Sequence, residues 1–257
     1  MEARFTGDFE WLNNDPVNDI MNSARGHIYD AMIACSLQEV RIEGGAPFWD
    51  EDVRSLFTQR LVEKTGGIEF YWSLGFKVPQ ISYLDMDWLK YFKDTLVEVQ
   101  DDKNQLPVFY GFILFAGQLY TNLYELFYPT YLSQIHVKIN HPTIVRRLVE
   151  HIWVAFAIDL DKSKPLIDQI IDSADLQKIT SLIDRIKIED SLQKDDKIRY
   201  VWARVMTIVE KSTDPYLQEK AFEMVYFAEL LQNFNVEDLD FFNRTISLKK
   251  SDVNMSL

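Results

Sequence analysis

The chain has 257 residues, of which 47% are hydrophobic and 14% aromatic, a composition that allows a large core and excludes a disordered chain. Its formal net charge of −13 disfavours binding to nucleic acid or to an anionic membrane surface, because both depend on clustered Lys and Arg. The single cysteine, Cys35, excludes an intrachain disulfide, and the first residues lack the apolar core of a signal peptide. These features predict a cytoplasmic protein.

The apolar residues of the first third of the chain follow a mostly helical period. The residues 14–16, Asn-Asp-Pro, are typical of a cap followed by a first-turn proline, and the Gly-Gly pair at 44–45 is typical of a helix end. Acidic residues at 50–52 predict the start of a second helix, since carboxylates favour the positive end of the helix dipole. That helix is expected to end at the Thr-Gly-Gly of 65–67.

The segment 68–84 has a less regular pattern. It is consistent with a short helix followed by an extended piece that ends near Pro79. Asp85 or Asp87 is then expected to cap a helix that reaches about Gln100.

The next segment, 104–124, contains 21 residues and no formal charge. A run of this length either spans a bilayer or lies at the centre of a packed domain. Its second half contains uncharged polar side chains, and its flanks show no excess of Lys or Arg on one side, which favours the central position over a membrane span. We therefore expect a buried central helix over about 105–128, broken before Pro129.

Helical spacing continues through the second half of the chain, with turn signals at 140–142 and a charged link at 194–197. The expected helical segments are 143–161, 165–172, 175–188, 198–211, 215–234 and a last turn at 237–242. The whole pattern predicts an all-α fold, a multi-helix bundle packed around the central uncharged helix. A single domain is expected over 1–245, followed by a flexible C-terminal tail over 246–257.

Motifs of catalysis are largely missing from the sequence. It contains no glycine-rich phosphate loop, no GxSxG turn, no CxxC pair and no HExxH helix. Helical enzymes also assemble active sites from scattered residues, so this absence leaves enzymatic activity open.

Three polar side chains lie on otherwise apolar helix faces, namely Glu39, Glu125 and His151. Burying them apart from one another would cost free energy, so we expect them to converge. Carboxylates and histidines inside a helical bundle form di-iron and di-manganese sites, and Asp159 would be the fourth ligand. The chain lacks the ExxH spacing of such sites, so the favoured interpretation is a structural hydrogen-bond network in which the histidine bonds to a backbone carbonyl or to a tyrosine hydroxyl.

The favoured function is a non-catalytic interaction or adaptor protein, whose acidic helical surface binds a basic protein partner without a cofactor. The amphipathic segments near 165–188 are candidates for the surface that meets this partner. A helical-bundle oxidoreductase or oxygenase with non-haem iron or manganese is the alternative, and a binder of an apolar small molecule between helices is a third. No nucleic acid and no membrane are expected among the partners.

Overall fold

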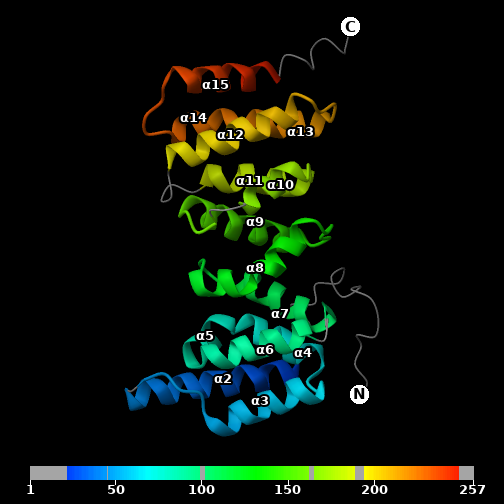
Figure 1. The fold of residues 1–257 in the computed structure, drawn as a ribbon, viewed down its shortest axis with the longest axis vertical. Helices are drawn as coiled ribbons and strands as arrows, with labels where there is room; N and C mark the ends of the chain where they lie inside the picture. The colour runs from blue at the N-terminus through cyan, green and yellow to red at the C-terminus, as the bar shows by residue number, and fades with distance from the viewer. Residues whose placement is uncertain (1–21, 45, 99–101, 162–164, 189–193, 249–257) are drawn as a thin grey trace. The chain divides into compact units, whose positions relative to one another are not determined.

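The computed structural model describes residues 22–44, 46–98, 102–161, 165–188 and 194–248 (Figure 1). Every regular secondary-structure element in these ranges is a helix, which confirms the predicted all-α multi-helix fold. None of these helices has both the length and the hydrophobicity required to cross a membrane. The chain divides into two compact units, Met1–Thr130 and Tyr131–Leu257. The single domain expected over 1–245 stays a prediction.

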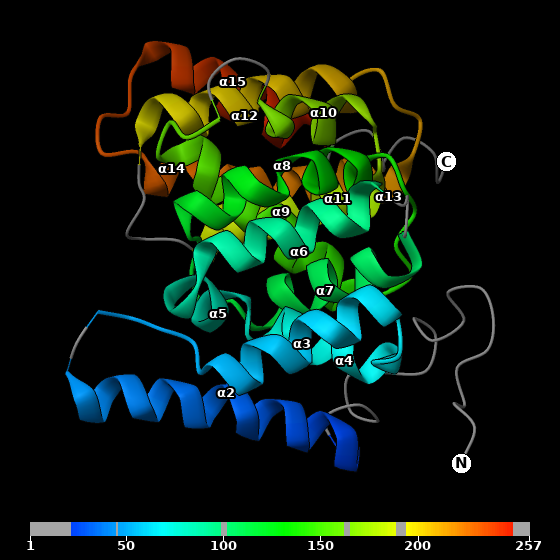
Figure 2. The same cartoon turned by 60° about the horizontal axis from the view of Figure 1, so that its bottom comes forward.

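The first unit is built from helices (Figure 2), and its core contains many aromatic side chains. Its elements are α2 (Ala24–Glu43), α3 (Glu51–Glu63), α4 (Gly67–Phe76), α5 (Val78–Leu84), α6 (Met86–Glu98), α7 (Asp102–Phe115) and the beginning of α8 (Thr121–Ile135). Trp49, Phe57 and Trp88 meet edge to face at the centre of this core. The buried indole of Trp88 donates to the hydroxyl of Thr58 at 2.8 Å, so this large side chain is buried with its polar atom satisfied.

Several predicted helix ends of the first unit are confirmed by capping contacts. Helix α2 ends at Gly44, which adopts the left-handed conformation (φ 65°) and donates its N–H to the carbonyl of Val40. The carboxylate of Asp50 accepts the N–H of Val53 at the start of α3. Asp85 accepts the N–H of Trp88 at 2.8 Å and so caps α6, as the sequence predicts. The predicted start of the first helix, at 14–16, lies outside the described residues.

Two predictions in the first unit are wrong. The segment expected to be partly extended is helical throughout as α4 and α5, because Pro79 lies in the first turn of α5, where its missing N–H costs no hydrogen bond. The central helix expected over 105–128 is two helices, α7 and α8, separated by the non-helical residues 116–120. The exposed Gly117 lies in this break, where its poor helix propensity favours a turn.

Pro129 also differs from its predicted role, because it lies inside α8 and does not end it. Pro129 and Glu125, four residues earlier, are both exposed. The backbone hydrogen bond that proline cannot make therefore lies on the solvent side of the helix, where water satisfies the free carbonyl.

Helices α4 and α7 pack at very short range because each presents a glycine at the crossing. A Cβ atom built on Gly75 of α4 would lie 2.5 Å from the carbonyl oxygen of Val108 and 3.0 Å from the Cα of Gly111. These neighbours are backbone atoms, which cannot rotate away as a flexible side chain would. The glycine pair thus sets the distance between the two helices and lets buried side chains such as Trp72 and Phe112 pack beside it.

The second unit contains the end of α8 and a stack of helices rich in Ile, Val and Leu. Its elements are α9 (Pro142–Ala157), α10 (Leu166–Asp172), α11 (Leu176–Ile188), α12 (Asp195–Val209), α13 (Pro215–Phe222), the 3₁₀ helix η2 (Glu223–Tyr226), α14 (Phe227–Leu230) and α15 (Val236–Leu248). Helix α9 packs on α11 and α10, and α12 packs on α13 and α15. Trp153 and Trp202 are among the largest fully buried side chains of this unit.

The C-terminal segments begin and end at other residues than predicted. Asp195 to Lys197, expected in a charged link, form the first turn of α12, where carboxylates complement the helix dipole. The single helix expected over 215–234 is α13, η2 and α14. Helix α15 extends to Leu248, so the tail predicted from 246 starts too early. The buried Thr245, which accepts the indole N–H of Trp202, ties this last turn to α12. Residues 249–257 lie outside the described residues.

The glycine crossing gives a prediction with a definite sign. Helix propensity alone would make Gly75→Ala stabilising by about 1 kcal/mol. We expect it instead to lower the free energy of unfolding by about 1–3 kcal/mol, because the added methyl group meets backbone. Denaturant unfolding measures this change.

The matched control is Gly117→Ala, since a Cβ atom there would meet nothing within 4 Å. Its free energy of unfolding should stay within about 0.5 kcal/mol of the parent chain. A Gly75→Ala chain as stable as its parent would show that the helices separate at no cost.

Candidate functional site

Glu39 and Glu125, predicted to be buried ligands, are both exposed. Helix α2 has apolar residues on two faces. The covered face carries Tyr29, Ile33 and Val40, and Glu39 lies on the other face. On α8, the covered face carries apolar side chains such as Phe127, and Glu125 lies outside it. The expected burial of these two carboxylates is therefore wrong, and they need no buried counter-ion.

His151 is buried, as predicted, with 3% of its surface exposed. Its Nδ1 atom lies 2.6 Å from the hydroxyl oxygen of the buried Tyr131, in the same unit. This distance is that of a short hydrogen bond, and the tautomer of the imidazole sets which partner donates. The contact is the histidine–tyrosine pairing of the structural interpretation.

Asp159 is an exposed residue with φ 60°, directly after α9. Its carboxylate lies 2.6 Å from the Nζ of Lys197 and 3.2 Å from that of Lys194. The hydrogen bonds from Lys197 and then Lys194 hold its pKa below the ordinary value of an aspartate. Two ammonium groups therefore already neutralise this carboxylate.

Across the described residues, no group of three or more His, Cys, Asp or Glu side chains is arranged to hold a metal ion. The metal centre on Glu39, Glu125, His151 and Asp159 stays a prediction, as do its iron or manganese and the oxidoreductase activity.

Two open pockets lie in the described part of the second unit. One, of about 480 Å³, is lined by Lys138, Asp175, Leu176, Gln177, Thr180 and Tyr216. The other, of about 390 Å³, is lined by Glu210, Gln218, Asn243, Arg244, Ser247 and Leu248. Neither lining includes an aromatic side chain of 105–128. The apolar-ligand hypothesis stays a prediction.

The amphipathic segments near 165–188 do not present their apolar faces to solvent. Ile167 and Ile170 of α10 and Ile179 and Ile183 of α11 are fully buried within the second unit. The role of these segments as the surface that meets a partner stays a prediction.

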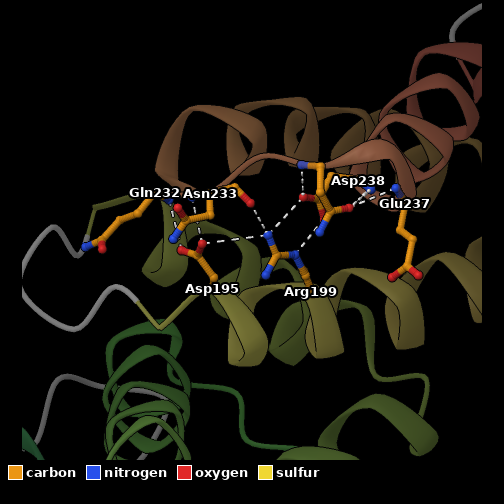
Figure 3. A network of polar contacts seen from close by, with 7 residues as sticks. Asp195, Arg199, Gln232, Asn233, Glu237 and Asp238 are labelled. Carbon is orange, nitrogen blue, oxygen red and sulfur yellow. Dashed lines mark hydrogen bonds and ion pairs between the residues drawn. The ribbon is translucent and has the colours of Figure 1, made fainter.

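A polar network fixes the loop between α14 and α15 (Figure 3). Arg199 of α12 donates from Nε and Nη2 to the two carboxylate oxygens of Asp238, at 2.7 and 2.9 Å. Asp238 is completely buried, and the hydrogen bonds from Arg199 hold its pKa below the ordinary value. Removing Arg199 would leave the buried charge of Asp238 without its counter-ion, so the pair fixes α15 against α12.

The loop itself is held through its backbone. Asp195, in the first turn of α12, accepts the N–H groups of Gln232 and Asn233, both at 2.9 Å. Arg199 also donates to the carbonyl oxygen of Asn233, as Figure 3 shows. These contacts satisfy backbone N–H and C=O groups of the loop that would otherwise form changing hydrogen bonds with water. They therefore favour one loop conformation.

A reciprocal cap completes the network at the start of α15. The side chain of Asn235 accepts the N–H groups of Glu237 and Asp238, at 2.8 and 3.1 Å. The carboxylate of Asp238 accepts the N–H of Asn235 at 2.8 Å in return. The spacing of Asn235 and Asp238 is that of a capping box, a signal that our sequence analysis missed. Arg199 could not be found in this way, because it is distant in sequence.

This fixed loop and the first turn of α15 carry exposed apolar side chains. Phe234, Val236 and Leu239 are 46%, 85% and 47% exposed, and we call these three residues the loop surface. Val236 is more exposed than any other large hydrophobic side chain in the described part of the chain. Exposed apolar residues on an ordered loop are typical of interaction sites.

The sequence around the loop surface is acidic. Residues 221–243 contain five acidic side chains and no Lys or Arg. Glu229, Glu237 and Asp240 are exposed among them. The loop surface is therefore apolar at its centre and negative at its edges, the pattern of an interface with an apolar core and a polar rim.

Comparison with known protein families, with curated proteins and with solved structures gives no match for this chain.

Acid titration tests the role of Asp238. Because its pKa is lowered in the folded state, its stabilisation is complete above the unfolded pKa of about 4 and is lost as the pH falls further. Asp238→Asn should reduce the free energy of unfolding at pH 7 and flatten its decrease below about pH 4. Asp240→Asn, at a far more exposed carboxylate, is the control and should leave the pH profile unchanged.

The contact between Tyr131 and His151 is tested with a double-mutant cycle. Tyr131→Phe and His151→Gln should couple by about 0.5–3 kcal/mol in the free energy of unfolding, because each removes the same buried hydrogen bond. Additive effects would show that the histidine owes its position to other neighbours.

Proposed function

We propose that this chain is a non-catalytic interaction protein that binds a basic protein partner through the loop surface, Phe234, Val236 and Leu239. The observation that carries the proposal is the combination of high exposure and fixed geometry. Val236 is 85% exposed at the start of α15, directly after a loop whose backbone is held by Asp195 and Arg199.

The fixed geometry supports binding because ordering a mobile loop costs conformational entropy on association. Because the network around Arg199 orders the loop during folding, this loss of conformational entropy does not occur on association. The apolar side chains are already in place when a partner arrives. Three exposed apolar side chains would otherwise favour aggregation, so their position on a well-ordered loop suits a specific interface.

The charge around the loop surface supports a basic partner. A segment with an apolar side chain and flanking Lys or Arg would bury Val236 and place its cations beside Glu237 and Asp240. Such an interaction should weaken as salt rises, because exposed charges are screened over about 8 Å at physiological ionic strength. A cytoplasmic location for this interaction stays a prediction.

Affinity capture with the full chain tests this function. Proteins captured from cell extract should be lost when the bait carries Val236→Asp, because a carboxylate at the centre of the interface must be desolvated without a partner. Each captured protein is then purified and its dissociation constant measured directly. We expect Val236→Asp to raise that constant at least about tenfold.

The matched control is Val137→Asp, at another exposed valine of the same unit. It should leave capture and affinity unchanged, and circular dichroism should show that both variants stay folded. A partner that binds the Val236→Asp chain as tightly as the parent chain, or that binds more tightly in high salt, would contradict the proposal.

A further inference from the structure

Helix α2 leaves one apolar face uncovered. The side chains of Ile28 and Ile42 are 53% and 74% exposed, and Cys35 between them is exposed as well. We call Ile28, Cys35 and Ile42 the α2 stripe. Its members are seven residues apart, so they share one side of the helix and span about 21 Å at a rise of 1.5 Å per residue. The C-terminal end of α2 extends past α3 and α5 in both views (Figures 1 and 2).

The α2 stripe is symmetric about its centre. Ile28 and Ile42 lie at equal distances from Cys35 along the helix. A two-fold interface requires a self-complementary surface, in which residue i meets residue j and residue j meets residue i. When two such helices run antiparallel about Cys35, Ile28 of each copy meets Ile42 of the other. The same apolar contact then forms twice.

Charges beside the stripe are complementary in the antiparallel direction. On one flank, Arg25 lies near the N-terminal end, and Glu39 and Glu43 lie near the C-terminal end, all exposed. Antiparallel pairing brings Arg25 of one copy beside Glu43 of the other, twice. Parallel pairing would instead place each flank beside the opposite flank of the other copy, so Arg25 would lie beside His27 and not beside an acidic residue. The other flank places His27 near Arg41 and contributes no ion pair.

We propose that two copies of this chain pair through the α2 stripe, antiparallel and with the two-fold axis at Cys35. The residues involved belong to the first unit and are separate from the loop surface, so this pairing does not rest on the proposed function. Residues 1–130 contain 20 acidic and 10 basic side chains, and this surplus opposes association of two copies at low salt. The pairing is therefore measured at physiological ionic strength, where charges further apart than about 8 Å are screened.

Light scattering on the full chain tests the pairing. We expect a mass that rises toward twice 30.2 kDa as the protein concentration increases. Ile42→Glu should raise the dissociation constant of the pair at least about tenfold, since a two-fold interface meets each substitution twice. Tyr91→Glu, at an exposed aromatic residue on α6 of the same unit, is the control and should leave the constant unchanged.

Disulfide cross-linking tests the direction of the helices. In a Cys35→Ser background, one chain carries Ile28→Cys and a second carries Ile42→Cys, so each has a single thiol. Copper phenanthroline with oxygen removes two electrons and two protons from a pair of thiols and joins the sulfurs. The mixture of the two chains should form linked dimers, whereas neither chain should do so alone.

Each outcome decides the proposal. A dimer that is weakened by Ile42→Glu and cross-links only in the mixture supports antiparallel pairing. A single-chain mass at all concentrations, a dimer unaffected by Ile42→Glu, or linked dimers from one chain alone would overturn it. Circular dichroism on every variant shows that the helices are intact, because both isoleucines are exposed and their substitution should leave the fold unchanged.

Discussion

The buried carboxylate of Asp238 requires a cation, and the arrangement of α12, α15 and the loop before α15 follows from that requirement. Arg199 satisfies it with two parallel hydrogen bonds and has one further donor contact, to a loop carbonyl. The same carboxylate closes the cap of α15. One ion pair thus positions α15, caps it and fixes the loop before it. Because the charge of Asp238 is fully buried, Arg199 has no alternative position of similar free energy.

In the first unit, close packing of uncharged groups positions the helices. The crossing of α4 and α7 depends on the absence of side chains at Gly75 and Gly111, which brings backbone against backbone. Burial in this unit also raises the pKa of Tyr110, because the phenolate would be desolvated there. The two units therefore use different means of fixing helices, a shape constraint in the first and a buried charge pair in the second.

Both proposed surfaces share one physical feature, an exposed apolar group on a rigid support. Val236 lies in the first turn of α15, next to a loop held by hydrogen bonds, whereas Ile42 lies on a helix whose other face is packed. Their chemical surroundings differ. The exposed side chains around the loop surface are mainly acidic and suit a basic partner, while the flank of the α2 stripe carries both signs and suits its own copy.

The sequence by itself determined the helical class, the ends of helices at local caps such as Gly44 and Asp85, and the burial of His151. These features depend on residues a few positions apart, so a linear pattern contains them. Only the tertiary structure decided which face of α2 is covered, where the uncharged segment breaks at Gly117, and that Arg199 meets Asp238. The sequence of a helix with two apolar faces does not show which face is covered by other helices. A charge pair 39 residues apart produces no periodic pattern in the sequence. Glu39 and Glu125 were therefore expected inside and lie outside, because burial is set by the neighbouring helices and not by the helix that carries the residue.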